Sequence, residues 1–193
     1  MISHKHKFIF IEVPKTGTTT ICYVLKKHFC GLQPSVYPDK HLPVDQYKKM
    51  FPKEMQTYFK FGFVRNPWSR VVSLFHRNEG VQMRKRMTFV EFVDWIQLAT
   101  DTSVKCNKFP KKNMLGFFEI NNKVNVDFIG KYENLQEDFN IICDKIGIQR
   151  QELPHINKSE HKHYTEYYDE ETKKIVAKKF EKDIEYFGYK FGE

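Results

Sequence analysis

The feature that most restricts the fold of this chain is a strand–loop–helix unit that occurs twice. Residues 7–13 are aromatic and β-branched without a helical period, which predicts a buried strand. They lead into a turn at Pro14–Thr20, after which apolar residues at helical spacing predict a helix. Residues 58–64 predict a second strand, and a second helix follows with Asn66 as its N-cap and Pro67 as its first residue.

The rest of the chain continues to alternate strands with helices. Thr88 and Asn134 are each followed by Glu three residues later, which is the pattern of a capping box, and Gly147 is placed to end a helix. The further predicted elements are a short helix at 44–50, a helix at 88–99, a loop at 100–122, a strand at 124–130, a helix at 134–147 and a final helix at 169–187. We therefore expect one domain over residues 1–193, with a three-layer α/β fold and a mainly parallel central sheet.

Composition narrows the class of protein. Charged residues make up 29% of the 193, and no apolar run approaches the roughly 18 to 20 residues that cross a bilayer. The first apolar run, Phe8–Ile11, is interrupted by Glu12 and Pro14 too early for a secretory signal. The four cysteines show no C-x-x-C spacing, which favours reduced thiols over a disulfide scaffold or a zinc ribbon. The sequence thus predicts a cytoplasmic protein without a membrane span.

The charge balance indicates an anionic partner. The chain has 32 Lys and Arg residues against 24 Asp and Glu residues, a net charge of +8. This excess favours a nucleotide, a nucleic acid, an acidic glycan or a lipid headgroup, without choosing among them.

The turn at Pro14–Thr20 has the character of a phosphate-binding turn. It lies between a strand and a helix N-terminus, where backbone N–H groups and the helix dipole favour an anion. Gly17 permits close approach, the threonines offer hydroxyl donors, and Lys15 offers a mobile cation. A Walker A loop is not matched, because Lys15 precedes the only glycine of the turn. The alternative is a turn whose threonines only cap the helix.

A second candidate anion site follows the second strand. Arg65 stands at the strand end, where its guanidinium could form a fork onto a phosphate, and Ser73 follows eight residues later on the helix. Arg70 lies on the same polar face, and for it we favour a structural ion pair. The alternative for the whole segment is an ordinary strand–helix connection with a solvated arginine face.

Together the two segments resemble the sulfotransferases that use 3′-phosphoadenosine 5′-phosphosulfate (PAPS). Residues 14–19 match the family's 5′-phosphosulfate loop, and residues 61–73 are similar to its 3′-phosphate segment. Residues 126–135, 153–159 and 183–189 are similar to the branch of carbohydrate (type 2) sulfotransferases and their small soluble relatives. The resemblance implies a P-loop-like fold, PAPS as co-substrate, PAP as product and no metal.

The resemblance also implies residue roles. Arg65 and Ser73 would hold the 3′-phosphate, and the 5′-phosphosulfate would be held by Lys15, Thr16, Gly17, Thr18, Thr19 and Thr20. The glycine-rich C-terminal nucleotide clamp of cytosolic small-molecule sulfotransferases is absent. Residues 153–159 are expected to replace it, with Lys158 and Ser159 as nucleotide contacts.

Transfer also requires a base that removes the proton of the attacking hydroxyl. His41 lies between the two motifs, as the base does in related sulfotransferases, whereas the alternative is an exposed loop histidine. His155 is interpreted as structural, and His161 with His163 forms a third group. The His-x-His pairs at 4–6 and 161–163 lack a third ligand at suitable spacing, so we predict no metal site.

The sequence therefore predicts a sulfotransferase with Lys15 and His41 as catalytic residues. The resemblance makes a carbohydrate hydroxyl the leading acceptor class, followed by another small molecule, and implies no nucleic-acid partner. One alternative is a nucleotide or small-molecule kinase of similar fold; another is a non-catalytic nucleic-acid-binding protein with lysine-rich faces. Acceptor identity and oligomeric state are left open.

Overall fold

A computed structural model describes residues 1–28, 41–76, 86–98, 113–154, 156 and 161–193. The chain divides into two compact units. The first comprises Met1–Val64 and Met114–Ile156, and the second comprises Arg65–Asn113 and Asn157–Glu193.

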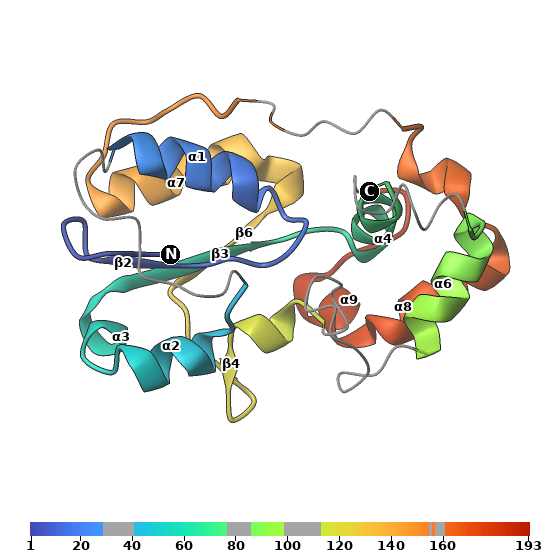
Figure 1. Cartoon of the computed structure of the whole chain (residues 1–193), viewed down its shortest axis with the longest axis horizontal. Coiled ribbons are helices and arrows are strands. Elements are labelled where there is room, and N and C mark those ends of the chain that lie inside the picture. Colours follow the sequence, from blue (N-terminus) through green and yellow to red (C-terminus); the bar gives the residue numbers. More distant parts are fainter. Residues whose placement is uncertain (29–40, 77–85, 99–112, 155, 157–160) are drawn as a thin grey trace. The chain divides into compact units, whose positions relative to one another are not determined.

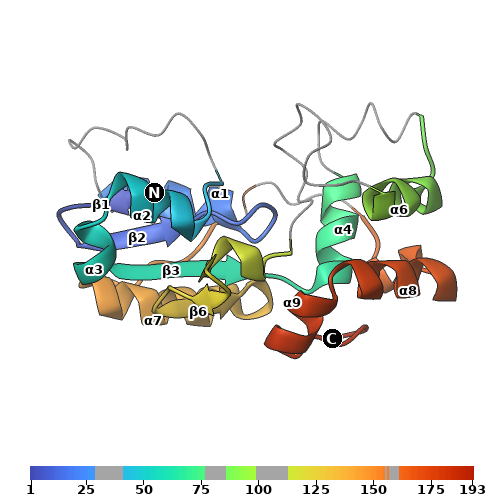
Figure 2. The same ribbon diagram turned by 90° about the horizontal axis from the view of Figure 1, so that it is seen from below.

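The first unit is built on a four-stranded sheet (Figure 2). Its strands, in spatial order, are β1 (Ile2–Ser3), β2 (Phe8–Ile11), β3 (Phe59–Val64) and β6 (Phe128–Lys131). β3 pairs in parallel with both β2 and β6, and β1 adds an antiparallel edge. The predicted α/β fold with a mainly parallel sheet is confirmed.

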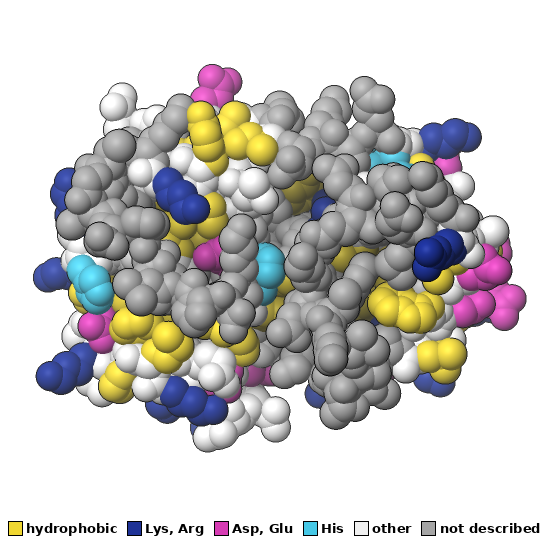
Figure 3. Space-filling view, viewed as in Figure 1, with side chains coloured by type: hydrophobic (Ala, Val, Ile, Leu, Met, Phe, Trp, Pro, Cys, Tyr) yellow, Lys and Arg dark blue, Asp and Glu magenta, His cyan; other side chains and the backbone are white. Residues whose placement is uncertain are grey.

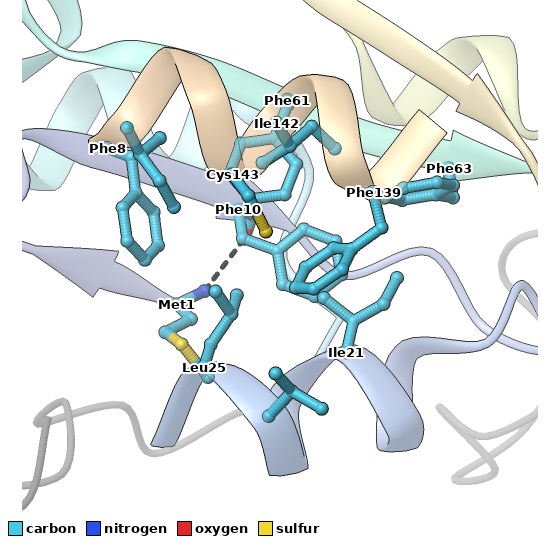
Figure 4. Packing of buried hydrophobic residues seen from close by; sticks show 12 residues of the cluster. Met1, Phe8, Phe10, Ile21, Leu25, Phe61, Phe63, Phe139, Ile142 and Cys143 are labelled. Carbon is cyan, nitrogen blue, oxygen red and sulfur yellow. Dashed lines mark hydrogen bonds between the residues drawn. The ribbon is translucent and has the colours of Figure 1, made fainter. Parts of the chain in front are cut away.

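Helices cover both faces of this sheet (Figure 1). α1 (Thr18–His28) and α7 (Leu135–Ile146) lie side by side on one face, and α2 (Val44–Met50) and α3 (Glu54–Thr57) lie on the other. Phenylalanines of β2 and β3 fill the space beneath α1 and α7, and the rings of Phe10 and Phe61 stack at 5.0 Å (Figure 4). This core fixes where β2 and β3 end, and hence where the segments that follow them begin.

The second unit is helical in its described residues. It contains α4 (Pro67–Phe75), α6 (Phe89–Leu98), α8 (Glu170–Lys179), α9 (Glu181–Phe187) and a 3₁₀ turn, η3 (Tyr164–Tyr167). The predicted caps of α4 and α6 are confirmed: Asn66 Oδ1 accepts from the backbone N–H groups of Trp68 and Ser69, and Thr88 exchanges hydrogen bonds with Glu91.

The predicted strand at 124–130 is wrong in its extent. Val124 belongs to a hairpin of β4 (Glu119–Ile120) and β5 (Lys123–Val124), which also lies partly in the expected loop at 100–122. Asn121 and Asn122 have φ of 52° and 57°, the left-handed pair that a tight hairpin turn requires. Asp127 precedes β6, and its carboxylate accepts from the Lys60 backbone N–H at 2.7 Å.

Two helix predictions also need correction. The final helix is two helices, because the backbone leaves helical geometry at Phe180 (φ −113°, ψ 26°), although the apolar spacing continues across the break. Asn134 occupies the N-cap position of α7 but makes no capping hydrogen bond with its side chain. The chain enters α7 from a 3₁₀ turn, η2 (Tyr132–Asn134), so Asn134 lacks the extended geometry that a cap needs. Gly147 ends α7 as predicted, with φ of 68°.

The surface of the described residues is mixed in character. On the face shown in Figure 3, Lys and Arg side chains lie at separate places, with acidic and apolar side chains between them. Within the described ranges, no helix combines the length and the apolar character needed to cross a bilayer.

Candidate functional site

The turn between β2 and α1 is braced by its own threonines. The hydroxyls of Thr16 and Thr18 donate to the carbonyl of Val13 at 2.9 and 2.7 Å, and both side chains are buried. Thr20 is also buried, whereas Thr19 is exposed. Because two hydroxyl protons are used within the turn, an anion here would be met mainly by backbone N–H groups at the start of α1.

Gly17 is required by both conformation and space. Its φ is +80°, and a Cβ placed there would lie 3.0 Å from Leu135 Cδ2 and 3.4 Å from Tyr132 Cδ2. The turn thus packs directly against η2 and the start of α7, which fixes its backbone.

We expect Gly17→Ala to lower the free energy of unfolding more than Gly147→Ala does. Both glycines have positive φ, so alanine costs roughly 1 to 2 kcal/mol of backbone strain at either position. Gly147 has open space where a Cβ would lie, whereas Gly17 does not, and the contact with Leu135 should add about 1 kcal/mol. Urea denaturation of the two variants measures the difference, and equal losses would show that the contact with Leu135 is unimportant.

Lys15 and His41 both have left-handed backbone conformations, each with φ of 70°. Among the described non-glycine residues only three others do, namely Lys7, Asn121 and Asn122. Such conformations cost free energy and persist where the surrounding structure enforces them, often at functional sites. Two of the five therefore fall on the residues that the sequence predicts to be catalytic.

The imidazole of His41 is held by the segment that leads into the turn. Its Nδ1 lies 2.8 Å from the backbone carbonyl oxygen of Glu12. A carbonyl can only accept, so Nδ1 is protonated in this contact, and in the neutral ring Nε2 is left without a proton. His41 is half-buried, and its Nε2 has the electronic form that a general base needs.

Glu12 and Cys22, both half-buried, belong to a polar cluster of the first unit. The Met1 ammonium donates to the Glu12 carboxylate at 3.2 Å, to the Tyr47 hydroxyl at 2.6 Å and to the Phe10 carbonyl at 2.8 Å, the last drawn in Figure 4. Burial, helped by the Glu12 carboxylate, raises the pKa of Cys22 to about 12. Cys22 is therefore a thiol at neutral pH, and nucleophilic chemistry at its sulfur is disfavoured.

Arg65 directly follows the last residue of β3 and opens the second unit. It is only 9% exposed, and its Nε donates to Ser69 Oγ at 3.0 Å. Ser73 is buried on α4, four residues beyond Ser69. Ser69 and Ser73 are four residues apart on α4 and so lie on one face of it, and Arg65, which precedes the helix, reaches that face through its bond to Ser69. Ser69 was not among the predicted site residues, although its position four residues before Ser73 could have indicated it.

Arg70 has the environment of a structural charge. It is 1% exposed, and its guanidinium carbon lies 5.8 Å from the centroid of the Phe180 ring. Burial lowers the pKa of Arg70 to about 10, while the buried carboxylate of Asp183 raises it. Arg70 therefore stays charged at neutral pH within the core of the second unit, and the ion pair favoured for it stays a prediction.

The remaining predicted residues are only partly described. Lys158, Ser159 and His155 lie outside the described residues. The centroid of the His161 ring lies 4.9 Å from that of the His76 ring. His76 was not among the predicted site residues, and its Nε2 lies 3.2 Å from the hydroxyl oxygen of Tyr167. Across the described ranges, no three His, Cys, Asp or Glu side chains converge as metal ligands.

Sequence comparisons identify relatives of this chain. A family model described as the sulfotransferase family matches residues 1–190. Carbohydrate sulfotransferase 9 of Homo sapiens is 28% identical, covering 95% of this chain and 47% of that protein. Carbohydrate sulfotransferase 14 of Danio rerio is 23% identical, covering 76% and 48%. The chain thus spans about half the length of these two relatives. An uncharacterized protein of Archaeoglobus fulgidus is 37% identical, covering 52% of this chain and 74% of that protein.

The fold has a counterpart among solved structures. The crystal structure of mouse sulfotransferase SULT7A1 complexed with PAP matches with a TM-score of 0.59 and 15% sequence identity, covering 95% of this chain and 86% of that one. At this identity the likeness concerns the fold alone, and it agrees with the α/β architecture described above.

Proposed function

Because the chain belongs to the sulfotransferase family, we propose that it transfers a sulfuryl group from PAPS to a hydroxyl acceptor. The observation that supports this most is the turn between β2 and α1, which presents Lys15, Gly17 and the helix N-terminus together. A second support is the Arg65–Ser73 segment, which begins where β3, the parallel neighbour of β2, ends. A third is the fold shared with a mouse sulfotransferase whose structure contains PAP.

The two segments suit opposite ends of the donor. Lys15 and the backbone N–H groups of residues 17–20 would hold the 5′-phosphosulfate. Arg65 would bind the 3′-phosphate through a charge-assisted hydrogen bond, and the Ser73 hydroxyl would donate a hydrogen bond to the same phosphate. Lys158 and Ser159 complete the proposed nucleotide contacts.

The chemistry is an in-line displacement at sulfur. His41 Nε2 takes the proton of the acceptor hydroxyl as the oxygen forms its bond to sulfur. The bond between sulfur and the bridging oxygen breaks, and PAP leaves with the electron pair. The Lys15 ammonium and the backbone dipoles stabilise the negative charge that grows on that oxygen. The His41–Glu12 contact keeps the required tautomer through this step.

For the acceptor we propose a carbohydrate hydroxyl, which the names of the two sequence relatives support. The test is incubation with sulfate-labelled PAPS and a panel of glycans, lipids and small alcohols. We expect label on a carbohydrate together with an equal amount of PAP. Label on a lipid or small alcohol alone would contradict the acceptor class and leave the transfer chemistry intact.

Arg65→Ala should weaken the binding of 3′,5′-ADP, which is the product PAP, by about 2 to 4 kcal/mol. The reason is that the substitution removes a charge-assisted contact to a desolvated phosphate. Binding of 5′-AMP, which has no 3′-phosphate, should hardly change. Calorimetry measures both affinities. Arg150→Ala is the matched control, since it removes an arginine whose side chain is 64% exposed and paired with Asp144 in the first unit. Equal losses for both nucleotides in Arg65→Ala would mean that Arg65 does not contact the 3′-phosphate.

A further inference from the structure

We propose that Ser69 is a positioning residue for the donor's 3′-phosphate, acting by orienting the guanidinium of Arg65. The inference rests on the proposed function, because it concerns how the Arg65 guanidinium is oriented toward the proposed 3′-phosphate. Ser69 does not itself contact the phosphate in this scheme.

The hydrogen bond between the two side chains fixes the direction of the guanidinium. Arg65 Nε donates to Ser69 Oγ at 3.0 Å, and Arg65 is 9% exposed. A guanidinium is planar and its donors form a rigid fork, so holding Nε–H sets the plane of the whole group. With Nε engaged by Ser69, a phosphate would be met by the terminal Nη groups rather than by the Nε edge.

Ser69 can act as a fixed reference because the first turn of α4 is itself held. The backbone N–H groups of Trp68 and Ser69 donate to Asn66 Oδ1 at 3.1 and 3.3 Å. Asn66 Nδ2 donates to the Lys190 carbonyl at 2.9 Å, and Trp68 Nε1 donates to the Lys173 carbonyl at 3.0 Å. These contacts, all within the second unit, anchor the turn on the segments around residues 173 and 190.

The hydrogen-bond acceptor at residue 69 is a hydroxyl oxygen, and its lack of charge suits this position. A serine oxygen is uncharged, so it accepts the Nε–H bond without neutralising the arginine. A carboxylate at the same place would orient the guanidinium equally well, but it would compete with the phosphate for the same positive charge. It would also carry a negative charge in the first turn of a helix, which favours stability.

The test compares four proteins by calorimetry: the wild type, Ser69→Ala, Ser69→Asp and the control Thr57→Ala. Thr57 carries a hydroxyl that donates to the Lys53 carbonyl in α3 of the first unit. The measured quantity is the ratio of the 3′,5′-ADP affinity to the 5′-AMP affinity. We expect Ser69→Ala to lower this ratio about 3- to 10-fold, since one hydrogen bond to a charged group is lost.

We expect Ser69→Asp to lower the ratio further, by about 30-fold or more, while its melting temperature stays equal to the wild type or rises. Thr57→Ala should keep the wild-type ratio. A merely structural role for Ser69 would instead lower stability and weaken both nucleotides alike.

The outcomes separate this inference from the function on which it rests. An unchanged ratio in both Ser69 variants, or equal weakening of both nucleotides, would overturn the positioning role of Ser69 alone. A wild-type protein that binds 3′,5′-ADP no better than 5′-AMP would overturn the proposed donor, and the positioning role with it.

Discussion

A His41→Ala protein is expected to transfer sulfate about a hundred- to ten-thousand-fold more slowly than the wild type, the usual range for loss of a general base. The structure supplies the physical reason. The contact between Nδ1 and the Glu12 carbonyl leaves Nε2 of the neutral ring able to accept a proton. Donor affinity and melting temperature should stay near their wild-type values, because His41 is only half-buried.

The pH dependence gives the same prediction a second readout. A base must be neutral to accept a proton, so wild-type turnover should fall at low pH, where the imidazole of His41 is protonated. His41→Ala should remove this fall. His6→Ala is a matched control, because His6 also contacts a backbone carbonyl through Nδ1, that of Ile146 at 3.3 Å. Near-normal turnover in His41→Ala would end the assignment and direct the search to His161, His155 or Glu12.

Lys15→Ala is expected to cut turnover about a hundred-fold or more, with a smaller loss of 3′,5′-ADP binding. The reason is that negative charge grows on the bridging oxygen only as the transition state forms, so the ammonium stabilises that state more than the bound donor. Steady-state rates and calorimetry on the same protein separate the two effects.

The control for Lys15 removes the same charge from the same unit. Lys26 is exposed on α1, and Lys26→Ala should leave turnover within about two-fold of the wild type, because an exposed charge is screened. If Lys15→Ala keeps its turnover within a few-fold, Lys15 is a residue of the turn without a part in the chemistry.

The elements that position the proposed site could be predicted because their signals are local. The run at Phe8–Ile11 is uniformly apolar, α2 has the predicted bounds Val44–Met50, and Asn66 followed by Pro67 is a strong helix start. β1 was missed because two residues are too short for a period to show. The break at Phe180 was missed because the apolar spacing is the same on both sides of it.

The candidate site, like the fold, could be predicted only in part. The two motifs and their resemblance to sulfotransferase segments predicted Lys15, Gly17, Arg65 and Ser73 as site residues, and their roles stay predictions. Side-chain directions could not be predicted, since they depend on tertiary contacts. The Thr16 hydroxyl was expected to serve an anion, yet it donates to the Val13 carbonyl, and the bond from Arg65 to Ser69 depends on how both side chains rotate.

The backbone conformations of Lys15 and His41, and the contact of His41 with Glu12, could not be predicted either. The sequence places the two residues 26 positions apart, and nothing in it indicates that both backbones are left-handed or that Glu12 fixes the histidine tautomer. The contact between His41 and Glu12 arises because the first unit brings residue 41 back to the end of β2. It is a property of packing rather than of local pattern.

The central claim, that this chain uses PAPS, is tested most directly by titrating the wild-type protein with 3′,5′-ADP, 5′-AMP and Mg²⁺–ATP in one buffer. The account predicts that 3′,5′-ADP binds at least about 30-fold more tightly than 5′-AMP, since one buried charge-assisted phosphate contact contributes about 2 kcal/mol or more. It also predicts that Mg²⁺–ATP binds more weakly than 3′,5′-ADP. Equal affinity for 3′,5′-ADP and 5′-AMP, or a preference for Mg²⁺–ATP, would contradict it.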